Sequence, residues 1–202
     1  MGKTMTILIS PFVVAFMVGC KANQNKPDCD SWRDRLVDLV QQGSLKSDTI
    51  KFQRALALSD SVLSVDTTTD NRRFCYYNRS IILNSLGRTE EGWKNKELEM
   101  LTLPENNLER LLFMAIKNDK EHKKDSAEFF LDKALSVCEC MLEKEFDENV
   151  VVYKVRALYI RLGEKSAKCY LNSQVAKHPE SEVLRWINDN WEGYTDGYAK
   201  FI

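Results

Sequence analysis

The sequence has few of the residues that form tight turns, with only 8 glycines and 4 prolines among 202 residues. This scarcity excludes a many-stranded β protein, and it leaves too little low-complexity sequence for a disordered chain. The chain also lacks an excess of charge of either sign, because 29 basic side chains face 30 acidic ones. A net charge of -1 supplies no positive field to hold nucleic acid, so we expect no nucleic-acid partner.

Residues typical of catalytic and metal sites are also scarce. The only 2 histidines are His122, inside the charged run 117–125, and the distant His178. The sequence contains no metal-ligand spacing, no phosphate-binding glycine loop and no nucleophile elbow. We therefore expect no enzyme, no cofactor, no metal and no small-molecule substrate, and we interpret the charged run as a solvated loop between helices.

The 6 cysteines include no CxxC pair. Cys138 and Cys140 are separated by one residue, so on a helix their side chains point in different directions. Small buried thiols are the simplest interpretation of Cys75, Cys138 and Cys169. A bridge between Cys138 and Cys169, or another disulfide involving Cys29 or Cys140, stays open at this point.

The first twenty residues are typical of a targeting segment. Lys3 precedes an apolar run from Ile7 to Val18, which ends at Gly19-Cys20 and is followed by the polar stretch 21–27. The run is shorter than the roughly 20 helical residues that span a bilayer, but it suits the apolar core of a secretory signal.

The segment Met17-Val18-Gly19-Cys20 resembles the lipobox of bacterial lipoprotein precursors, with Met17 where leucine is usual. The resemblance implies that residues 1–19 are a signal peptide and that Cys20 carries the lipid. Residues 20–30 would then be the lipidated cysteine and a flexible linker, which hold the chain to a membrane of the bacterial cell envelope. The protein would face the periplasm or the cell surface. A single-span anchor, or an ordinary signal with an incidental cysteine, is the alternative.

From Ser31 onward, apolar residues recur at three- and four-residue intervals, which predicts amphipathic helices. We expect the first helix to end at Gly43-Ser44 and Ser47 or Asp48 to cap the second. The Gly-rich tail from Gly193 is not expected to continue the last helix. Further helices are predicted at about 48–65, 74–86, 108–117, 126–146, 152–162 and 183–191. A partner helix after Gly87 runs through about Leu103, and another after Gly163 ends at His178-Pro179.

The segment 74–104 resembles a tetratricopeptide repeat, a helix-turn-helix unit defined by residue size at a few positions. The break at Leu162-Gly163 repeats the one at Leu86-Gly87 after 76 residues, or two periods of 38. Three charged residues, Arg79, Lys96 and Glu99, depart from the family pattern. The residues that carry the resemblance are the large Tyr76 and Tyr77, the small Ser80 and Gly92, Gly87 at the turn and Pro104 after the second helix.

The resemblance implies an all-α fold for residues 31–202: a right-handed superhelical stack of about four helical hairpins with a C-terminal capping helix. A lone hairpin cannot cover its apolar face, so stacked hairpins bury one another. The capping helix contains Trp186 and Trp191, which either pack the end of the stack or form an exposed aromatic surface.

Repeats of this kind bind peptides or protein helices in an inner groove lined by first-helix residues. The resemblance therefore implies Tyr77, Asn78 and Tyr153 as candidate partner-binding residues. We expect a membrane-anchored lipoprotein that acts as a protein- or peptide-binding scaffold. One alternative is a structural component of envelope assembly without a peptide groove. Another is a glycan-handling lipoprotein with two carboxylates and aromatic side chains at one cleft.

Four triplets that begin at Asp48, Asp60, Asp66 and Asp125 resemble O-glycan acceptors of exported bacterial proteins. Each triplet also has a simpler interpretation. Asp48 and Asp125 stand where helices are expected to start, Asp66 stands in a turn, and the triplet at Asp60 can occur by chance.

Overall fold

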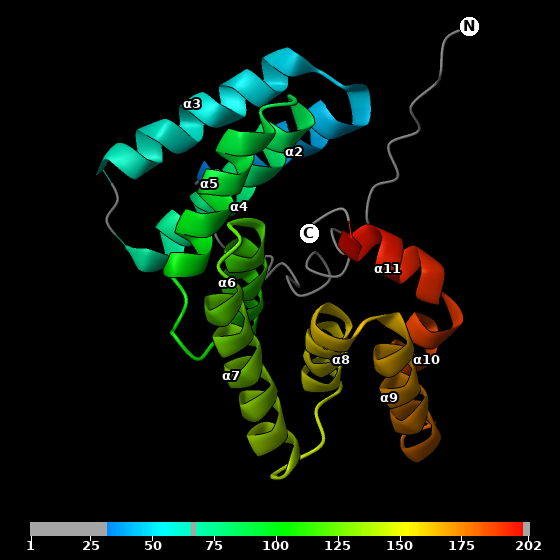
Figure 1. The fold of residues 1–202 in the computed structure, drawn as a ribbon. Helices are drawn as coiled ribbons and strands as arrows, with labels where there is room; N and C mark the ends of the chain where they lie inside the picture. The colour runs from blue at the N-terminus through cyan, green and yellow to red at the C-terminus, as the bar shows by residue number, and fades with distance from the viewer. Residues whose placement is uncertain (1–31, 66–67, 200–202) are drawn as a thin grey trace, which may run out of the picture. The chain divides into compact units, whose positions relative to one another are not determined.

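The computed structural model describes residues 32–65 and 68–199, with side chains described as far as Thr195. Within these ranges there are ten helices and no strand, which confirms the predicted all-α fold (Figure 1). The helices are α2 (Trp32–Lys46), α3 (Thr49–Val65), α4 (Thr69–Ser85), α5 (Thr89–Leu101), α6 (Leu108–Lys120), α7 (Lys124–Leu142), α8 (Glu148–Leu162), α9 (Glu164–Lys177), α10 (Glu182–Asp189) and α11 (Trp191–Ala199).

Consecutive helices pack in adjacent pairs, as the repeat predicts. α2 packs on α3, α4 on α5, α6 on α7 and α8 on α9, and each pair also contacts the next one along the chain. The first helices of these pairs begin at residues 32, 69, 108 and 148, close to the predicted period. All of these helices, with α10, lie in one compact unit, whereas α11 belongs to a second unit and is described by itself.

Among the described residues, apolar clusters join helices that are neighbours in the sequence. Each cluster draws on two or three helices that follow one another in the chain, so burial proceeds in series. The clusters among the described residues are Leu36, Val40, Phe52, Ala55 and Ile82 from α2 to α4; Met100 and Phe113 from α5 and α6, with Leu103 from the turn between them; Leu111, Leu112, Ala115, Leu131, Ala134 and Ala157 from α6 to α8; and Leu108, Cys138 and Val150, also from α6 to α8.

Helix ends follow local chemistry that the sequence predicts. Asp48 Oδ1 accepts a hydrogen bond from Ile50 N at 2.9 Å, which caps α3 and confirms the expected cap. Gly87 and Gly163 have positive φ angles of 74° and 80°, a conformation that favours glycine, at the turns after α4 and α8.

Two predicted helix ends are wrong. α2 continues through Gly43 to Lys46, because the absence of a side chain at Gly43 lets the Phe52 ring lie against the helix backbone. The Gly-rich tail forms α11 from Trp191 to Ala199, so its glycines, at about 1 kcal/mol each relative to alanine, do not prevent a helix. The charged run is also shorter as a loop than expected, since only residues 121–123 separate α6 from α7.

The two tryptophans of the predicted cap differ in burial. Trp186 on α10 is 46% exposed, so cap packing is wrong for this residue and the aromatic-surface alternative describes it better. Trp191 is buried, with its ring 6.2 Å from that of Tyr194. The two residues lie on different helices, because α10 ends at Asp189.

Two of the three cysteines predicted to be buried are so. Cys75 and Cys138 are fully buried, and burial raises the pKa of the Cys138 thiol to about 12. Cys169 is exposed, contrary to the prediction, because the buried face of α9 is formed by Ala167 and Leu171. Cys140 is exposed, and all four of these thiols are free, so the possible bridge between Cys138 and Cys169 does not form. Cys29 lies outside the described residues.

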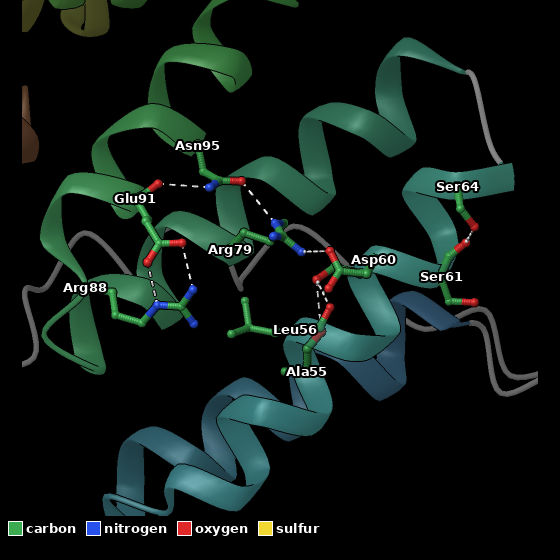
Figure 2. Close-up of polar contacts among 10 residues, drawn as sticks. Ala55, Leu56, Asp60, Ser61, Ser64, Arg79, Arg88, Glu91 and Asn95 are labelled. Carbon is green, nitrogen blue, oxygen red and sulfur yellow. Dashed lines mark hydrogen bonds and ion pairs between the residues drawn. The ribbon is translucent and has the colours of Figure 1, made fainter.

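Arg79 connects the first two helix pairs, although the repeat pattern expects a small or apolar residue there (Figure 2). Its guanidinium pairs with Asp60 on α3 and donates a hydrogen bond to Asn95 Oδ1 on α5 at 3.0 Å. Asn95 Nδ2 donates in turn to Glu91 O at 2.9 Å, and Arg88 pairs with Glu91 at 2.7 Å. This network holds α3, α4 and α5 in register.

The described acceptor-like triplets occupy helices. Asp48 caps α3, Asp60 lies within α3 and pairs with Arg79, and Asp125 lies in the first turn of α7. Asp66 lies outside the described residues. The hydroxyl-bearing residues that follow the three described aspartates, Thr49, Ser61 and Ser126, are all exposed.

Gly92 lets α4 and α5 approach closely, as its place in the repeat predicts. A Cβ at this position would lie 2.3 Å from Asn84 Oδ1 and 3.1 Å from the Ser80 carbonyl oxygen. The Asn84 side chain can rotate away, but the carbonyl of α4 cannot. We expect Gly92→Ala to lower the free energy of unfolding by about 1 kcal/mol, even after the gain in helix propensity.

Urea denaturation of the full chain measures this change. The matched control is Gly193→Ala in α11, where an added Cβ meets nothing within 4 Å and should not destabilise the protein. An unchanged urea midpoint for Gly92→Ala would contradict the close approach of α4 and α5.

Candidate functional site

The three predicted partner-binding residues have different environments. Tyr77 on α4 is 37% exposed, and Tyr153 on α8 is partly buried. Asn78 is 5% exposed, and its Nδ2 donates a hydrogen bond to Phe74 O at 2.9 Å within α4. Asn78 is therefore buried and offers a partner much less surface than Tyr77, because the face of α4 that meets other helices includes residue 78. Cys20, the predicted lipid site, lies outside the described residues.

The spacing between first helices is uneven. α2 contacts α4, α6 contacts α8 and α8 contacts α10, but among the described residues no Cα of α4 comes within 8 Å of a Cα of α6. The second and third pairs are joined instead through α5 and α6. Long polar side chains meet at this wider step, which is the junction between the second and third helix pairs.

Lys96 on α5 is the centre of these polar contacts. Its Nζ lies 3.1 Å from Glu109 Oε1 on α6 and 3.0 Å from Glu99 Oε2 on α5, and 5.8 Å from the centre of the Tyr77 ring. We name Tyr77, Lys96, Glu99, Glu109 and Tyr153 the Lys96 cluster. Its members come from α4, α5, α6 and α8.

The two tyrosines share two charged neighbours, Lys96 and Glu109. Burial raises the pKa of Tyr77, with Lys96 opposing the rise and Glu99 and Glu109 adding to it. Burial also raises the pKa of Tyr153, where Glu109 adds to the rise and Lys96 opposes it. Two residues that are 76 positions apart in the sequence therefore lie in one electrostatic environment.

Glu99 is the most buried charged residue of the cluster, at 3% exposure. Its buried Oε2 pairs with Lys96 Nζ, and no other described group donates a hydrogen bond to it. Burial raises the pKa of Glu99 despite the nearby Lys96. Burial lowers the pKa of Lys96, but attraction to Glu109 and Glu99 outweighs it, so the Lys96 pKa is raised overall. Lys96 thus keeps its charge, while Glu99 takes up a proton more readily than an ordinary carboxyl.

Two arginines flank the cluster. Arg156 on α8 has its guanidinium carbon 5.5 Å from the centre of the Tyr153 ring. Arg73 on α4 is partly buried, and it stands one helical turn before Tyr77. Both arginines oppose the rise in the Tyr153 pKa, and Arg73 opposes that of Glu99. Their charges therefore act at the same place.

The charged members of this site were not predicted. In the sequence, Lys96 and Glu99 stand out only as departures from the repeat pattern. No sequence feature indicates a role for Glu109, Arg73 or Arg156. The available signal was the pair of charges on α5 at positions where the repeat expects small or apolar residues. A charge at such a position needs a partner from a neighbouring helix.

Other surface features lie away from this cluster. One shallow pocket is lined by residues of α9, including Lys168 and Cys169. Another lies around the turn between α7 and α8 and is lined by residues 141 and 144–148. His178 stacks on Phe146 with ring centres 3.6 Å apart, beside the second pocket. In the part of the chain that the structure describes, no three His, Cys, Asp or Glu side chains are grouped so as to hold a metal ion.

No helix within the described ranges is both long and apolar enough to cross a bilayer. Comparison of the chain with protein-family models, with curated proteins and with solved structures gave no match. Any function for this protein must therefore be argued from its own residues.

The pKa of Glu99 gives a pH dependence of stability with a definite sign. Because its folded-state pKa lies above the ordinary value of 4.5, ionised Glu99 weakens the folded state at neutral pH. This penalty is relieved as the pH falls through the folded-state pKa toward 4.5. Glu99→Gln, which mimics the protonated form, should be at least as stable as wild type at pH 7 and should gain less on acidification to pH 5.

Urea denaturation at pH 7 and pH 5 measures both effects. The matched variant Lys96→Met has the opposite expectation, since it leaves Glu99 and Glu109 without their cation and should destabilise the protein by about 1–3 kcal/mol. If Glu99→Gln proved as damaging at pH 7 as Lys96→Met, the raised pKa of Glu99 would be wrong.

Proposed function

We propose that this chain is a non-enzymatic, lipid-anchored protein of the bacterial cell envelope, whose helix pairs form a tetratricopeptide-like scaffold for a protein or peptide partner. One observation carries the binding role. Tyr77 and Tyr153, on α4 and α8, share Lys96 and Glu109 as charged neighbours. Tyrosine and arginine side chains are enriched among the residues that contribute most to binding at protein interfaces.

Serial packing supports the scaffold. Pairs of similar length follow one another at nearly constant intervals, and each contacts the next. A small, constant rotation between such pairs produces a superhelix with an extended binding surface. A right-handed superhelix of four hairpins, with α10 packing on α8 and α9 at its end, is the arrangement we propose for this unit.

The lipobox-like segment at residues 17–20 supports the anchor. Each acyl methylene buried in a bilayer contributes about 0.8 kcal/mol, so two or three acyl chains on Cys20 would hold the protein almost permanently. A flexible linker of roughly ten residues reaches on the order of 15–20 Å. The proposed binding surface would therefore work close to lipid headgroups.

A glycan-handling role has some support in the same cluster, because it contains two carboxylates and two tyrosines. Glycoside hydrolysis, however, needs both carboxyl groups to flank the sugar. Lys96 pairs with both Glu99 and Glu109, and Glu99 is almost fully buried. We therefore favour partner binding over hydrolysis for these residues.

The anchor is tested by Cys20→Ala in the bacterial host. We expect the variant to lose labelling by radioactive palmitate and to leave the membrane fraction, since no thiol remains to carry the lipid. Cys29→Ala is the matched control and should label and fractionate as wild type does. Equal membrane association of Cys20→Ala and wild type would refute lipid anchoring at this residue.

The binding role is tested by cross-linking in intact cells, followed by purification of the full chain from detergent. Tyr77→Ala combined with Tyr153→Ala should reduce partner recovery about tenfold or more, the loss expected on truncating central aromatic residues. Tyr170→Ala is the matched control, because Tyr170 on α9 is also partly buried beside a lysine, Lys154. Partner recovery equal to that of the control, with both variants folded by circular dichroism, would remove the cluster from the interface.

A further inference from the structure

The charges around the Lys96 cluster are unevenly paired. Both carboxylates, Glu99 and Glu109, contact the single cation Lys96. Two further cations, Arg73 and Arg156, lie close enough to the cluster to oppose the rise in the Tyr153 pKa. The five charged groups therefore carry one more positive than negative charge, and the carboxylates are directed at Lys96.

The Arg73 guanidinium is attracted by Glu99 but forms no ion pair with it. Among the described residues, none forms a hydrogen bond or an ion pair with its guanidinium. The side chain is nevertheless partly buried. A guanidinium carries five N–H donors, and desolvating them without an acceptor is unfavourable. Such a group becomes more stable when a partner supplies a carboxylate.

The surface around the Lys96 cluster combines positive charge with the aromatic rings of Tyr77 and Tyr153. Arg73 precedes Tyr77 by four residues on α4, and Tyr153 precedes Arg156 by three on α8, so each arginine lies on the same side of its helix as a tyrosine. The two arginine–tyrosine couples are brought together by the packing of α8 on α6 and by the contact of α5 with α6. A peptide backbone or apolar stem can lie on the rings while its carboxylates pair with the arginines.

We propose that this face binds an internal acidic segment of a partner protein, with Asp or Glu side chains received by Arg73 and Arg156 and flanked by Tyr77 and Tyr153. The inference rests on the proposed binding function and specifies its partner by charge. A basic segment is disfavoured, because the carboxylates that could receive it are already paired with Lys96. Arginine suits this role because its planar fork binds a carboxylate through two parallel hydrogen bonds.

The test is selection from a library of random peptides displayed on phage, with their carboxyl ends joined to the coat protein. The bait is the full chain, solubilised in detergent micelles and attached to the support through a C-terminal tag. We expect the selected peptides to be enriched in Asp and Glu relative to the input. One selected peptide, synthesised with both ends capped and labelled with fluorescein, then reports affinity by fluorescence polarisation.

Variants locate the binding. Arg73→Ala and Arg156→Ala should each lower the affinity for the capped peptide about tenfold, the effect of losing one charge-assisted hydrogen bond. Arg73→Lys should restore part of the affinity. Arg54→Ala, which removes one exposed positive charge from α3, is the matched control and should leave affinity unchanged. Added salt should weaken binding to wild type.

Each outcome decides between the two proposals. Acidic peptides whose binding depends on Arg73 and Arg156 support both. Enrichment of neutral or basic peptides overturns the acidic-segment inference but leaves a peptide-binding scaffold. Acidic peptides that bind Arg73→Ala as tightly as Arg54→Ala also overturn the inference, because the charge of α4 then plays no part. A library that yields no enriched peptide contradicts peptide binding itself, and the acidic-segment inference with it.

Discussion

The apolar side of each helix pair can be covered only by the next pair along the chain, and this constraint organises the structure. One cluster joins α2, α3 and α4, a second joins α5 and α6, and a third joins α6, α7 and α8. In the described part of the chain, burial is therefore shared between sequence neighbours, as it is in proteins built from stacked repeats. Polar side chains are tolerated at the steps between pairs, provided that they find partners across the step.

Two such steps use charge differently. Between the first and second pairs, Arg79 is satisfied by Asp60 and Asn95, so its charge is used within the fold. Between the second and third pairs, Lys96 is paired twice while Arg73 forms no ion pair or hydrogen bond among the described residues. The contacts of Arg79 therefore stabilise the packing of the first two pairs. At the second step, the charge of Arg73 can still receive a carboxylate beside Tyr77. This difference is why the binding proposal concerns the second step.

Features that depend on one residue's own conformation were predictable. Asp48 caps a helix because its side chain reaches nearby backbone N–H groups, and Gly87 and Gly163 adopt positive φ. Features that depend on packing were not. Gly43 continues α2 because Phe52 fills the space beside it. Asn78 is buried while Tyr77 is partly exposed, because adjacent residues on a helix point about 100° apart. The apolar periodicity does not fix the rotation of the helix about its axis to better than one residue.

The sequence by itself determined the number and approximate limits of the paired helices, because apolar spacing, caps and turn glycines are local signals. It also predicts a targeting segment before Cys20, which lies outside the described residues. Only the tertiary structure decided that Lys96, Glu109 and Tyr153, from three separate helices, meet beside Tyr77. That meeting depends on how each helix is rotated and on the wide separation of α4 from α6, and neither is encoded in the spacing of residues along one helix.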